Sequence, residues 1–172
     1  MTDEHLGPRG SELIAALKTA RVEFVAALPD IWTSRGFLWP VAQDPDLRLV
    51  RLCKEDEGVT FCSALAFCER RAVLSMQYTG FLDSVNSIRG TAVNYNQPVC
   101  MLVGLLAKEP DKAPRDSKRY DVRITQGIIE AMGIDHLCIE SSADVALLAP
   151  AIDRAYEQSR PLVAMIGREV RP

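Results

Sequence analysis

The sequence predicts an α/β protein in which a parallel sheet is covered by helices on both faces, giving three layers. Two observations predict this fold class. Short apolar segments alternate with longer segments of helical character along the chain. The segment 99–104 is continuously apolar, as expected of a strand that is buried on both faces. Strands that alternate with helices are joined by right-handed crossovers, so the strands are expected to be parallel.

The first half of the chain shows this alternation clearly. The pair Ser11-Glu12 opens a helix whose apolar residues share one face. Pro29 ends the apolar strand that follows, and the segment 47–53 alternates as Leu-Arg-Leu-Val-Arg-Leu-Cys, which indicates the second strand. The expected elements are helix 11–20, strand 22–28, helix 30–42, strand 47–53, helix 55–68 and strand 72–76.

The second half continues the pattern around one irregular segment. Residues 107–118 are rich in proline and charge, so we expect a surface loop there. Gly133 ends the helix that follows this loop. The expected elements are helix 82–95, strand 99–104, helix 120–132, strand 136–140, helix 143–158 and strand 162–166.

Composition excludes several classes of protein. With 172 residues, 48% of them apolar, the chain is long enough for one compact core and too apolar to be disordered. A net charge of −3 with both signs interspersed provides no basic surface for nucleic acid. No apolar run approaches the ~18 to 20 residues of a membrane span, and no secretory signal is visible. We therefore expect one domain in a cytoplasmic protein, with residues 1–10 frayed.

The cysteines and histidines have neither metal-site nor catalytic spacing. The five cysteines form no Cys-x-x-Cys pair, and the two histidines, His5 and His136, are far apart in the sequence. Reduced cysteines are readily accepted as small core residues. Neither a zinc site nor a Cys/His nucleophile is expected.

Polar residues follow the first three expected strands. Asp30 follows the first, Glu55-Asp56-Glu57 the second and Gln77-Tyr78-Thr79-Gly80 the third. Ligands of open parallel sheets bind at the carboxyl ends of strands, so these residues are candidates for a binding site. A structural interpretation stays open, because carboxylates at a helix start also act as caps, and an Asp after proline is a common N-cap.

Four segments, taken in order, resemble a known family. They are Leu28-Pro29-Asp30, Glu55-Asp56-Glu57-Gly58-Val59, Met76-Gln77-Tyr78-Thr79-Gly80 with Asn86 further on, and Arg123-Ile124-Thr125-Gln126-Gly127 leading into Glu130-Ala131-Met132-Gly133-Ile134. The chain resembles the pyrimidine-binding (PYR) domain of thiamine-diphosphate enzymes over residues 11–170. The similarity is greatest to the alpha subunit of sulfopyruvate decarboxylase and to phosphonopyruvate decarboxylases.

The resemblance implies a PYR-type thiamine-diphosphate-binding fold and a subunit of a 2-oxo acid decarboxylase. In this family a glutamate at the start of the helix after the second strand bonds the aminopyrimidine ring of the cofactor. Glu57, directly before Gly58, is the residue that we match to it, with Glu55 as the alternative. Residues two apart on a helix point in different directions, so only one of the two can meet the ring.

The resemblance assigns further roles at the same site. Gln77, Thr79 and Gly80 match family positions that line the cofactor and the substrate. Asp30 matches a family position near the reacting carbon, where it would handle protons. These roles stand beside the open interpretation of the same residues as turns and caps.

A second chain is also implied by the resemblance. Enzymes of this type hold Mg²⁺ and the diphosphate with a Gly-Asp-Gly motif and a later Asn-Asn, and neither occurs in these 172 residues. We therefore expect a split enzyme, in which a separate diphosphate-binding (PP-domain) beta subunit shares the cofactor with this chain. A homodimer or a higher oligomer is expected from the family.

The segment after the third strand departs from the family pattern Gln-Asn-Ser-Gly-Leu-Gly-Asn at Tyr78, Leu82 and Asp83. A negative charge at Asp83 disfavours an anionic substrate tail, such as that of 3-sulfopyruvate or 3-phosphonopyruvate. A non-catalytic scaffold or regulatory subunit is therefore an alternative function, and a flavodoxin-like ligand module is disfavoured by the absence of a glycine-rich first turn. Four cations are candidates for contact with an anionic tail: Arg89, Arg115, Lys118 and Arg119.

Overall fold

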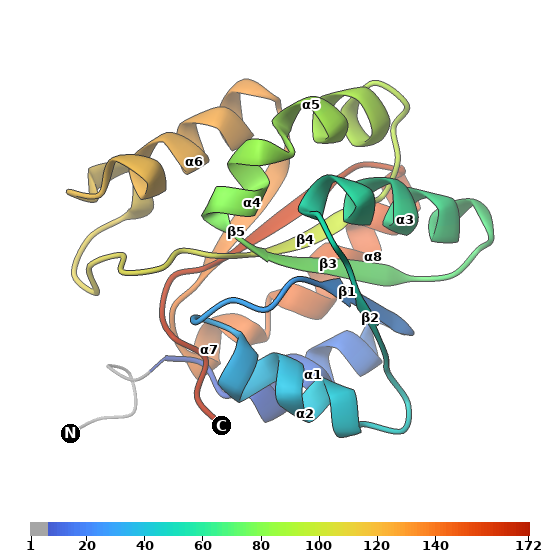
Figure 1. Ribbon diagram of the computed structural model, residues 1–172, viewed down its shortest axis with the longest axis horizontal. Helices are drawn as coiled ribbons and strands as arrows, with labels where there is room; N and C mark the ends of the chain where they lie inside the picture. Colours follow the sequence, from blue (N-terminus) through green and yellow to red (C-terminus); the bar gives the residue numbers. More distant parts are fainter. Residues whose placement is uncertain (1–6) are drawn as a thin grey trace.

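The computed structural model describes residues 7–172, which form one open sheet of six strands with helices around it (Figure 1). The strand order is β2-β1-β3-β4-β6-β5, and every neighbouring pair is parallel. The parallel α/β fold predicted from the alternation is confirmed. The strands are β1 (Phe24–Ala27), β2 (Arg48–Arg51), β3 (Ala72–Gln77), β4 (Cys100–Gly104), β5 (Asp135–Ile139) and β6 (Leu162–Ile166).

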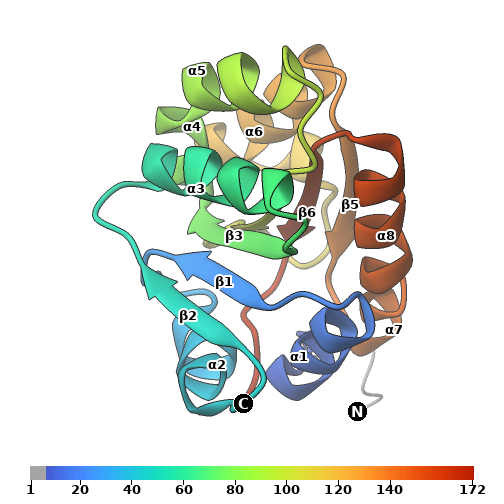
Figure 2. The same ribbon diagram turned by 90° about the vertical axis from the view of Figure 1, so that its right-hand side faces the viewer.

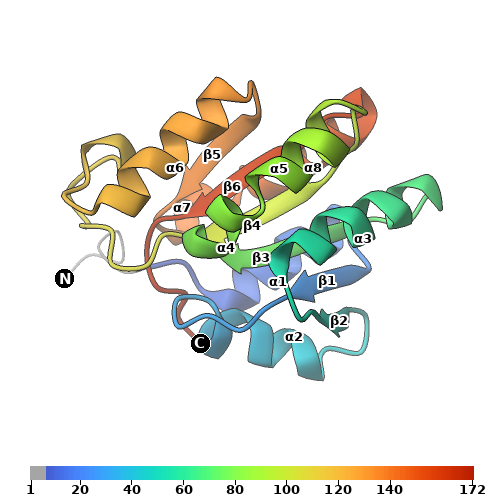
Figure 3. The ribbon, with the colours of Figure 1, turned by 45° about the horizontal axis from the view of Figure 1, so that its top comes forward.

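Helices cover both faces of this sheet (Figures 1 and 2). The upper face in Figure 1 carries α3 (Glu55–Phe67), α4 (Tyr78–Asp83), α5 (Val85–Ser87), the π-helical segment η3 (Ile88–Val93) and α6 (Tyr120–Ala131), which Figure 3 shows from above. The lower face carries α1 (Gly10–Thr19), the π-helical segment η2 (Ser34–Leu38), α2 (Trp39–Gln43), α7 (Ser142–Val145) and α8 (Leu148–Gln158).

The central strands contribute side chains to two separate apolar cores. On β4, Leu102 joins the core between the sheet and the lower-face helices α1 and α8. Its neighbours Met101 and Val103 join the core between the sheet and the upper-face helices α3 and α6. Successive side chains of a strand point to opposite faces, so a strand covered on both sides needs apolar residues at every position. All five residues of β4 and of β6 are buried, which accounts for their continuously apolar sequences.

Three expected helices differ from the observed ones. The helix expected over 30–42 is replaced by a turn at Asp30 that is followed by η2 and α2, because the Asp30 carboxylate accepts hydrogen bonds from the next backbone N–H groups. The helix expected over 82–95 begins earlier, at Tyr78, and runs as α4, α5 and η3. The helix expected over 143–158 is divided into α7 and α8. Pro150 has no N–H group to donate within a helix, so it is accommodated in the first turn of a new one.

The two ends of the described chain lie side by side. The Gly10 N–H donates to the Arg171 carbonyl at 2.8 Å, and the Arg171 N–H donates to the Pro8 carbonyl at 2.9 Å. A Cβ on Gly10 would overlap the carbonyl of Gly36 in η2, so the close packing of α1 against η2 requires glycine at position 10. Fraying is expected from the sequence over 1–10, but residues 7–10 are held in this way, and residues 1–6 lie outside the described part.

Cysteines occupy both the core and the surface. Cys62 and Cys100 are buried and Cys138 is half-buried, whereas Cys53 and Cys68 are exposed, and all five are free thiols. Burial raises the pKa of the Cys62 thiol to about 12.

Within residues 7–172, no helix combines the length and apolar character that a membrane span requires.

The loop after β4, expected as a surface segment over 107–118, is closed by one carboxylate. Glu109 accepts hydrogen bonds from Ser117 Oγ at 2.7 Å and from the Lys118 N–H at 3.0 Å. The bond from Ser117, together with the backbone N–H bonds, lowers the pKa of Glu109 to about 2. The ionised Glu109 therefore ties the two ends of this loop together.

We expect Glu109→Gln to loosen this loop without unfolding the domain. The Lys118 amide should then exchange its hydrogen several-fold faster, because a charge-assisted hydrogen bond is weakened. Since the pKa of Glu109 is lowered in the folded state, its contribution is complete above the ordinary carboxyl pKa of about 4.3 and is lost as the pH falls towards 2. Amide hydrogen exchange measures this effect, with the exposed α8 residue Glu157→Gln as control. An unchanged Lys118 exchange rate in Glu109→Gln would contradict the assignment.

Candidate active site

The topology creates a crevice between β1 and β3. The chain leaves β1 through η2 and α2 on the lower face, whereas it leaves β3 through α4 on the upper face (Figure 2). Where neighbouring strands send their connections to opposite faces, ligands bind at the carboxyl ends of those strands. This part of the sheet edge is therefore where a site is expected on topological grounds alone.

A hollow of about 340 Å³ lies at this position. We call it the Glu55 hollow. Its volume lies at the lower end of the ~300–1,000 Å³ range of small-molecule clefts. The residues that line it come from the segment after β1, the start of α3 and the β3–α4 junction: Leu28, Pro29, Asp30, Ile31, Glu55, Gln77 and Thr79.

Glu55 is the glutamate that lines this hollow. It is the first residue of α3, which begins directly after Lys54, whose backbone is extended (φ −141°, ψ 151°). Its side chain is half-buried, and within residues 7–172 its carboxylate has neither a hydrogen bond nor an ion pair. The positive end of the α3 dipole favours a carboxylate at this position. The hollow thus contains an ionisable group that is free to bind a ligand.

Glu57 lies elsewhere. Its Oε2 accepts hydrogen bonds from the N–H groups of Cys53 and Lys54, at 3.2 and 3.3 Å, and its side chain is exposed outside the hollow. This is the reciprocal bond of a capping box, in which the third helical residue satisfies the N–H at the N-cap. The sequence contains the signal, since a glutamate three residues after an N-cap position is typical of this motif.

The third carboxylate of the cluster also serves the helix start. Asp56 Oδ1 accepts the Glu57 N–H at 3.0 Å, and Asp56 Oδ2 lies 3.6 Å from Lys54 Nζ. The acidic cluster is therefore divided between two tasks. Asp56 and Glu57 stabilise the start of α3, and Glu55 is left to face the hollow.

Asp30 both lines the hollow and organises the backbone after β1. Its Oδ1 accepts the N–H groups of Trp32 at 2.5 Å and Thr33 at 3.1 Å, and its Oδ2 accepts the Thr33 hydroxyl at 2.5 Å. Three hydrogen bonds fix the orientation of this carboxylate. Asp30 therefore forms the turn after β1 and also lines the hollow.

Thr79 and Gly80 lie in the first turn of α4, and Gln77 directly precedes this helix. Strand β3 passes into α4 with no connecting residue, and Gln77 is the N-cap with an extended backbone. The Thr79 hydroxyl donates to Gln77 Oε1 at 2.7 Å, which fixes both side chains at the mouth of the hollow. Gly80 is buried against Glu55, and a Cβ at position 80 would overlap the Glu55 side chain.

The residues that depart from the family pattern lie outside the hollow. Tyr78 is buried, and Leu82 is half-buried against the core under α3 and α4. Asp83 is 63% exposed and lies 3.7 Å from Lys54 Nζ, which partly balances its charge. None of the four candidate cations for an anionic tail (Arg89, Arg115, Lys118 and Arg119) is among the residues that line the hollow.

Two residues of the site region were not singled out from the sequence. Ile31 lines the hollow although it is 74% exposed, and Trp32 follows it. The Trp32 indole N–H donates to the Ile166 carbonyl at 3.1 Å, so the segment after β1 crosses the end of β4 to reach β6. The available signal is the apolar pair directly after Pro29-Asp30, at a position where a surface turn is usually polar.

Comparison with known proteins gives one informative similarity. No protein-family profile matches the chain. Over 168 residues the chain is 24% identical to a protein named sulfopyruvate decarboxylase from Methanosarcina acetivorans, and the match covers 92% of this chain. The chain spans only 40% of the length of that relative. The resemblance to this group of enzymes that the sequence motifs indicate is confirmed at this level of similarity.

We expect Gly80→Ala to displace the Glu55 side chain while the fold is retained. The added methyl group overlaps the flexible end of Glu55, which can rotate away, so the cost in stability is small. Gly127→Ala is the matched control, because position 127 in α6 has open space around it. That change should raise the free energy of unfolding by about 0.5–1 kcal/mol.

Crystal structures and thermal unfolding of both variants measure these effects. A Glu55 side chain that keeps its position in Gly80→Ala would contradict the packing argument.

Proposed function

We propose that this chain is the PYR-type half of a split thiamine-diphosphate-dependent 2-oxo acid decarboxylase, with residues 11–170 as the PYR-type domain. The observation that carries the proposal is the position of Glu55, a half-buried carboxylate without a protein partner in residues 7–172 at the switch point of the sheet. The similarity to a sulfopyruvate decarboxylase supports the reaction class.

The residues of the Glu55 hollow fit the aminopyrimidine part of the cofactor. A ring with nitrogen atoms needs a carboxylate in its plane and apolar walls, and the hollow offers Glu55 together with Leu28, Pro29 and Ile31. When bound, thiamine diphosphate supplies the nucleophilic carbon and the electron sink for loss of CO₂ from a 2-oxo acid. In the proposal, Glu55 holds a proton at its carboxylate in a hydrogen bond with a ring nitrogen, and the apolar walls exclude water from that bond.

Glu55 takes this role in the proposal in place of Glu57. The carboxylate of Glu57 is already an acceptor for two backbone N–H groups, and it points to solvent. A residue that must share a proton with a ligand needs a free oxygen and a position in the cleft. Glu55 meets both conditions.

The other residues of the hollow orient the ligands. Gln77 and Thr79 are fixed by their mutual hydrogen bond and offer polar groups at the mouth, and Gly80 provides the space for Glu55. Asp30 is held by three hydrogen bonds, so it presents a negative charge of fixed orientation. We propose that Asp30 lies near the reacting carbon of the substrate and influences the proton transfers there.

The diphosphate and Mg²⁺ are assigned to a partner chain. The 172 residues contain neither Gly-Asp-Gly nor Asn-Asn, and the relative is longer than this chain. In this arrangement the Glu55 hollow is one wall of a cleft that a PP-domain beta subunit completes.

The proposed substrates are 2-oxo acids of the 3-sulfopyruvate or 3-phosphonopyruvate type. Asp30 and Glu55 are the only charged residues that line the hollow within residues 7–172, and both are acidic. A sulfonate or phosphonate tail must therefore be bound by cations beyond the lining of the hollow. The departures at Tyr78, Leu82 and Asp83 favour the second candidate, a non-catalytic scaffold or regulatory subunit.

A paired substitution tests the proposal. The tagged chain is purified from its native cells together with its partner, and the complex is assayed with 2-oxo acids, thiamine diphosphate and Mg²⁺. Glu55→Gln should lower kcat by at least about 100-fold, because the proton-sharing carboxylate is lost. Glu57→Gln is the matched control, and it should retain activity, since glutamine also serves in a capping box.

Thermal unfolding and calorimetric titration with the cofactor accompany the assay, so that loss of activity is distinguished from loss of folding. Full activity of Glu55→Gln would overturn the assignment of Glu55. A complex in which no partner carries Gly-Asp-Gly and Asn-Asn, and in which no 2-oxo acid is decarboxylated, would favour the scaffold function.

A further inference from the structure

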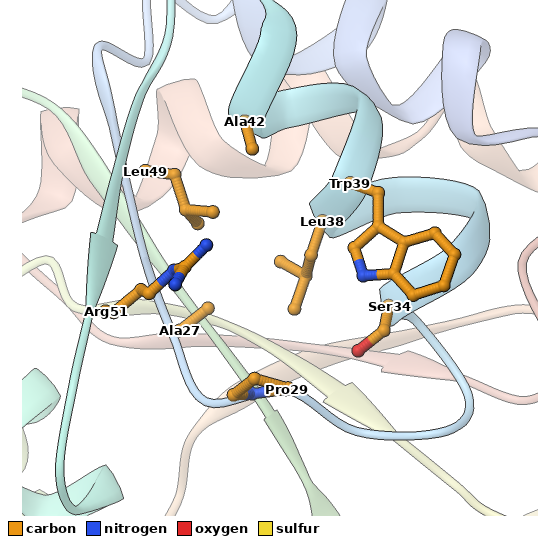
Figure 4. Close-up of a pocket in the computed structure, with 8 residues that line it drawn as sticks. All are labelled: Ala27, Pro29, Ser34, Leu38, Trp39, Ala42, Leu49 and Arg51. Carbon is orange, nitrogen blue, oxygen red and sulfur yellow. The ribbon is translucent and has the colours of Figure 1, made fainter.

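A second hollow, of about 240 Å³, lies between β2 and the η2–α2 segment (Figure 4). We call it the Arg51 hollow. It is separate from the Glu55 hollow, although Pro29 lines both. Its lining residues are Ala27, Pro29, Ser34, Leu38, Trp39, Ala42, Leu49 and Arg51.

Strand alternation directs one cation into this hollow. Leu49 and Arg51 are two residues apart on β2, so both side chains point to the lower face, where α2 lies. Arg48 points to the opposite face, where its guanidinium lies 5.6 Å from the centre of the Phe24 ring. Figure 4 shows the Arg51 guanidinium directed into the hollow from the strand side.

Arg51 has no competing anion there. None of the eight lining residues is acidic, and within residues 7–172 Arg51 forms neither an ion pair nor a side-chain hydrogen bond. On the helix side, the buried hydroxyl of Ser34 has no hydrogen-bond partner among the described residues, and Figure 4 shows it directed towards the hollow. A guanidinium and a hydroxyl donor thus lie on opposite walls of one hollow.

The remaining walls are apolar. Leu38 is buried, Leu49 is half-buried, and the ring of Trp39 lines the rim while 65% of this residue remains exposed. A volume of about 240 Å³ corresponds to about eight non-hydrogen atoms at the ~30 Å³ that a water molecule occupies in the liquid. A planar guanidinium binds carboxylates with two parallel hydrogen bonds.

We propose that the Arg51 hollow binds a small monocarboxylate with an apolar body of five or six carbon atoms. Arg51 binds the carboxylate, and Leu38, Leu49 and Trp39 enclose the apolar part. The site is independent of the proposed decarboxylase function, because it uses neither Glu55 nor a cofactor.

Calorimetric titration of the purified chain with 4-methylpentanoate tests this site, with 4-methylpentanamide as the uncharged ligand of the same size. We expect saturable binding of one equivalent of the acid and at least about tenfold weaker binding of the amide. Arg51→Gln should weaken binding of the acid by about tenfold or more. Arg48→Gln, on the same strand and the opposite face, should leave it unchanged, as should Glu55→Gln in the other hollow.

Indole N–H resonances provide an independent readout. The Trp39 resonance should shift on titration, whereas that of Trp32, whose N–H is bonded to the Ile166 carbonyl, should not. Absence of saturable binding to the wild-type chain would overturn the proposal. Equal affinity of Arg51→Gln and the wild type, or an equal loss in Arg48→Gln, would also overturn it. Thermal unfolding of each variant verifies that the fold is retained.

Discussion

The burial of β3, β4 and β6 on both faces is the constraint on which the rest of the structure depends. Strands without a solvent-facing side must be covered by helices above and below, so each connection has to cross one face. The chain therefore moves outwards from β1 to β2 and then returns past β1 to β3. This return separates the connections after β1 and β3, and the Glu55 hollow lies where they separate.

The fold was largely predictable because burial determines it. The expected strand segments overlap all six observed strands, and the last one, 162–166, has the expected bounds. The sequence predicted the breaks within helices less well. The division between α7 and α8 and the π-helical segment η2 depend on how individual side chains satisfy backbone groups, and hydrophobic periodicity carries little information about such local competition.

The sequence also predicted which edge of the sheet carries the polar residues of the candidate site. It did not determine which of the two glutamates, Glu55 or Glu57, faces the hollow. All three neighbouring side chains end in a carboxylate, and the geometry of the helix start distinguishes them. Lys54 is the N-cap, so the Glu57 side chain turns back and accepts hydrogen bonds from the N–H groups at the N-cap. The Glu55 side chain instead packs against Gly80. The pairing of Glu55 with Gly80 joins residues 25 positions apart (55 and 80), and only the packing of α3 on α4 brings them together.

The close approach of the two chain ends has a consequence for how this fold can be encoded. Residues 9 and 171 form a parallel bridge, and both ends of the described chain leave the domain at the same corner. A domain with neighbouring ends can be circularly permuted, or inserted within another polypeptide, without displacing a strand. Joining this domain to another polypeptide, or separating it from one, therefore changes only the linkers outside the sheet. The same architecture suits an independent chain and a module of a longer one.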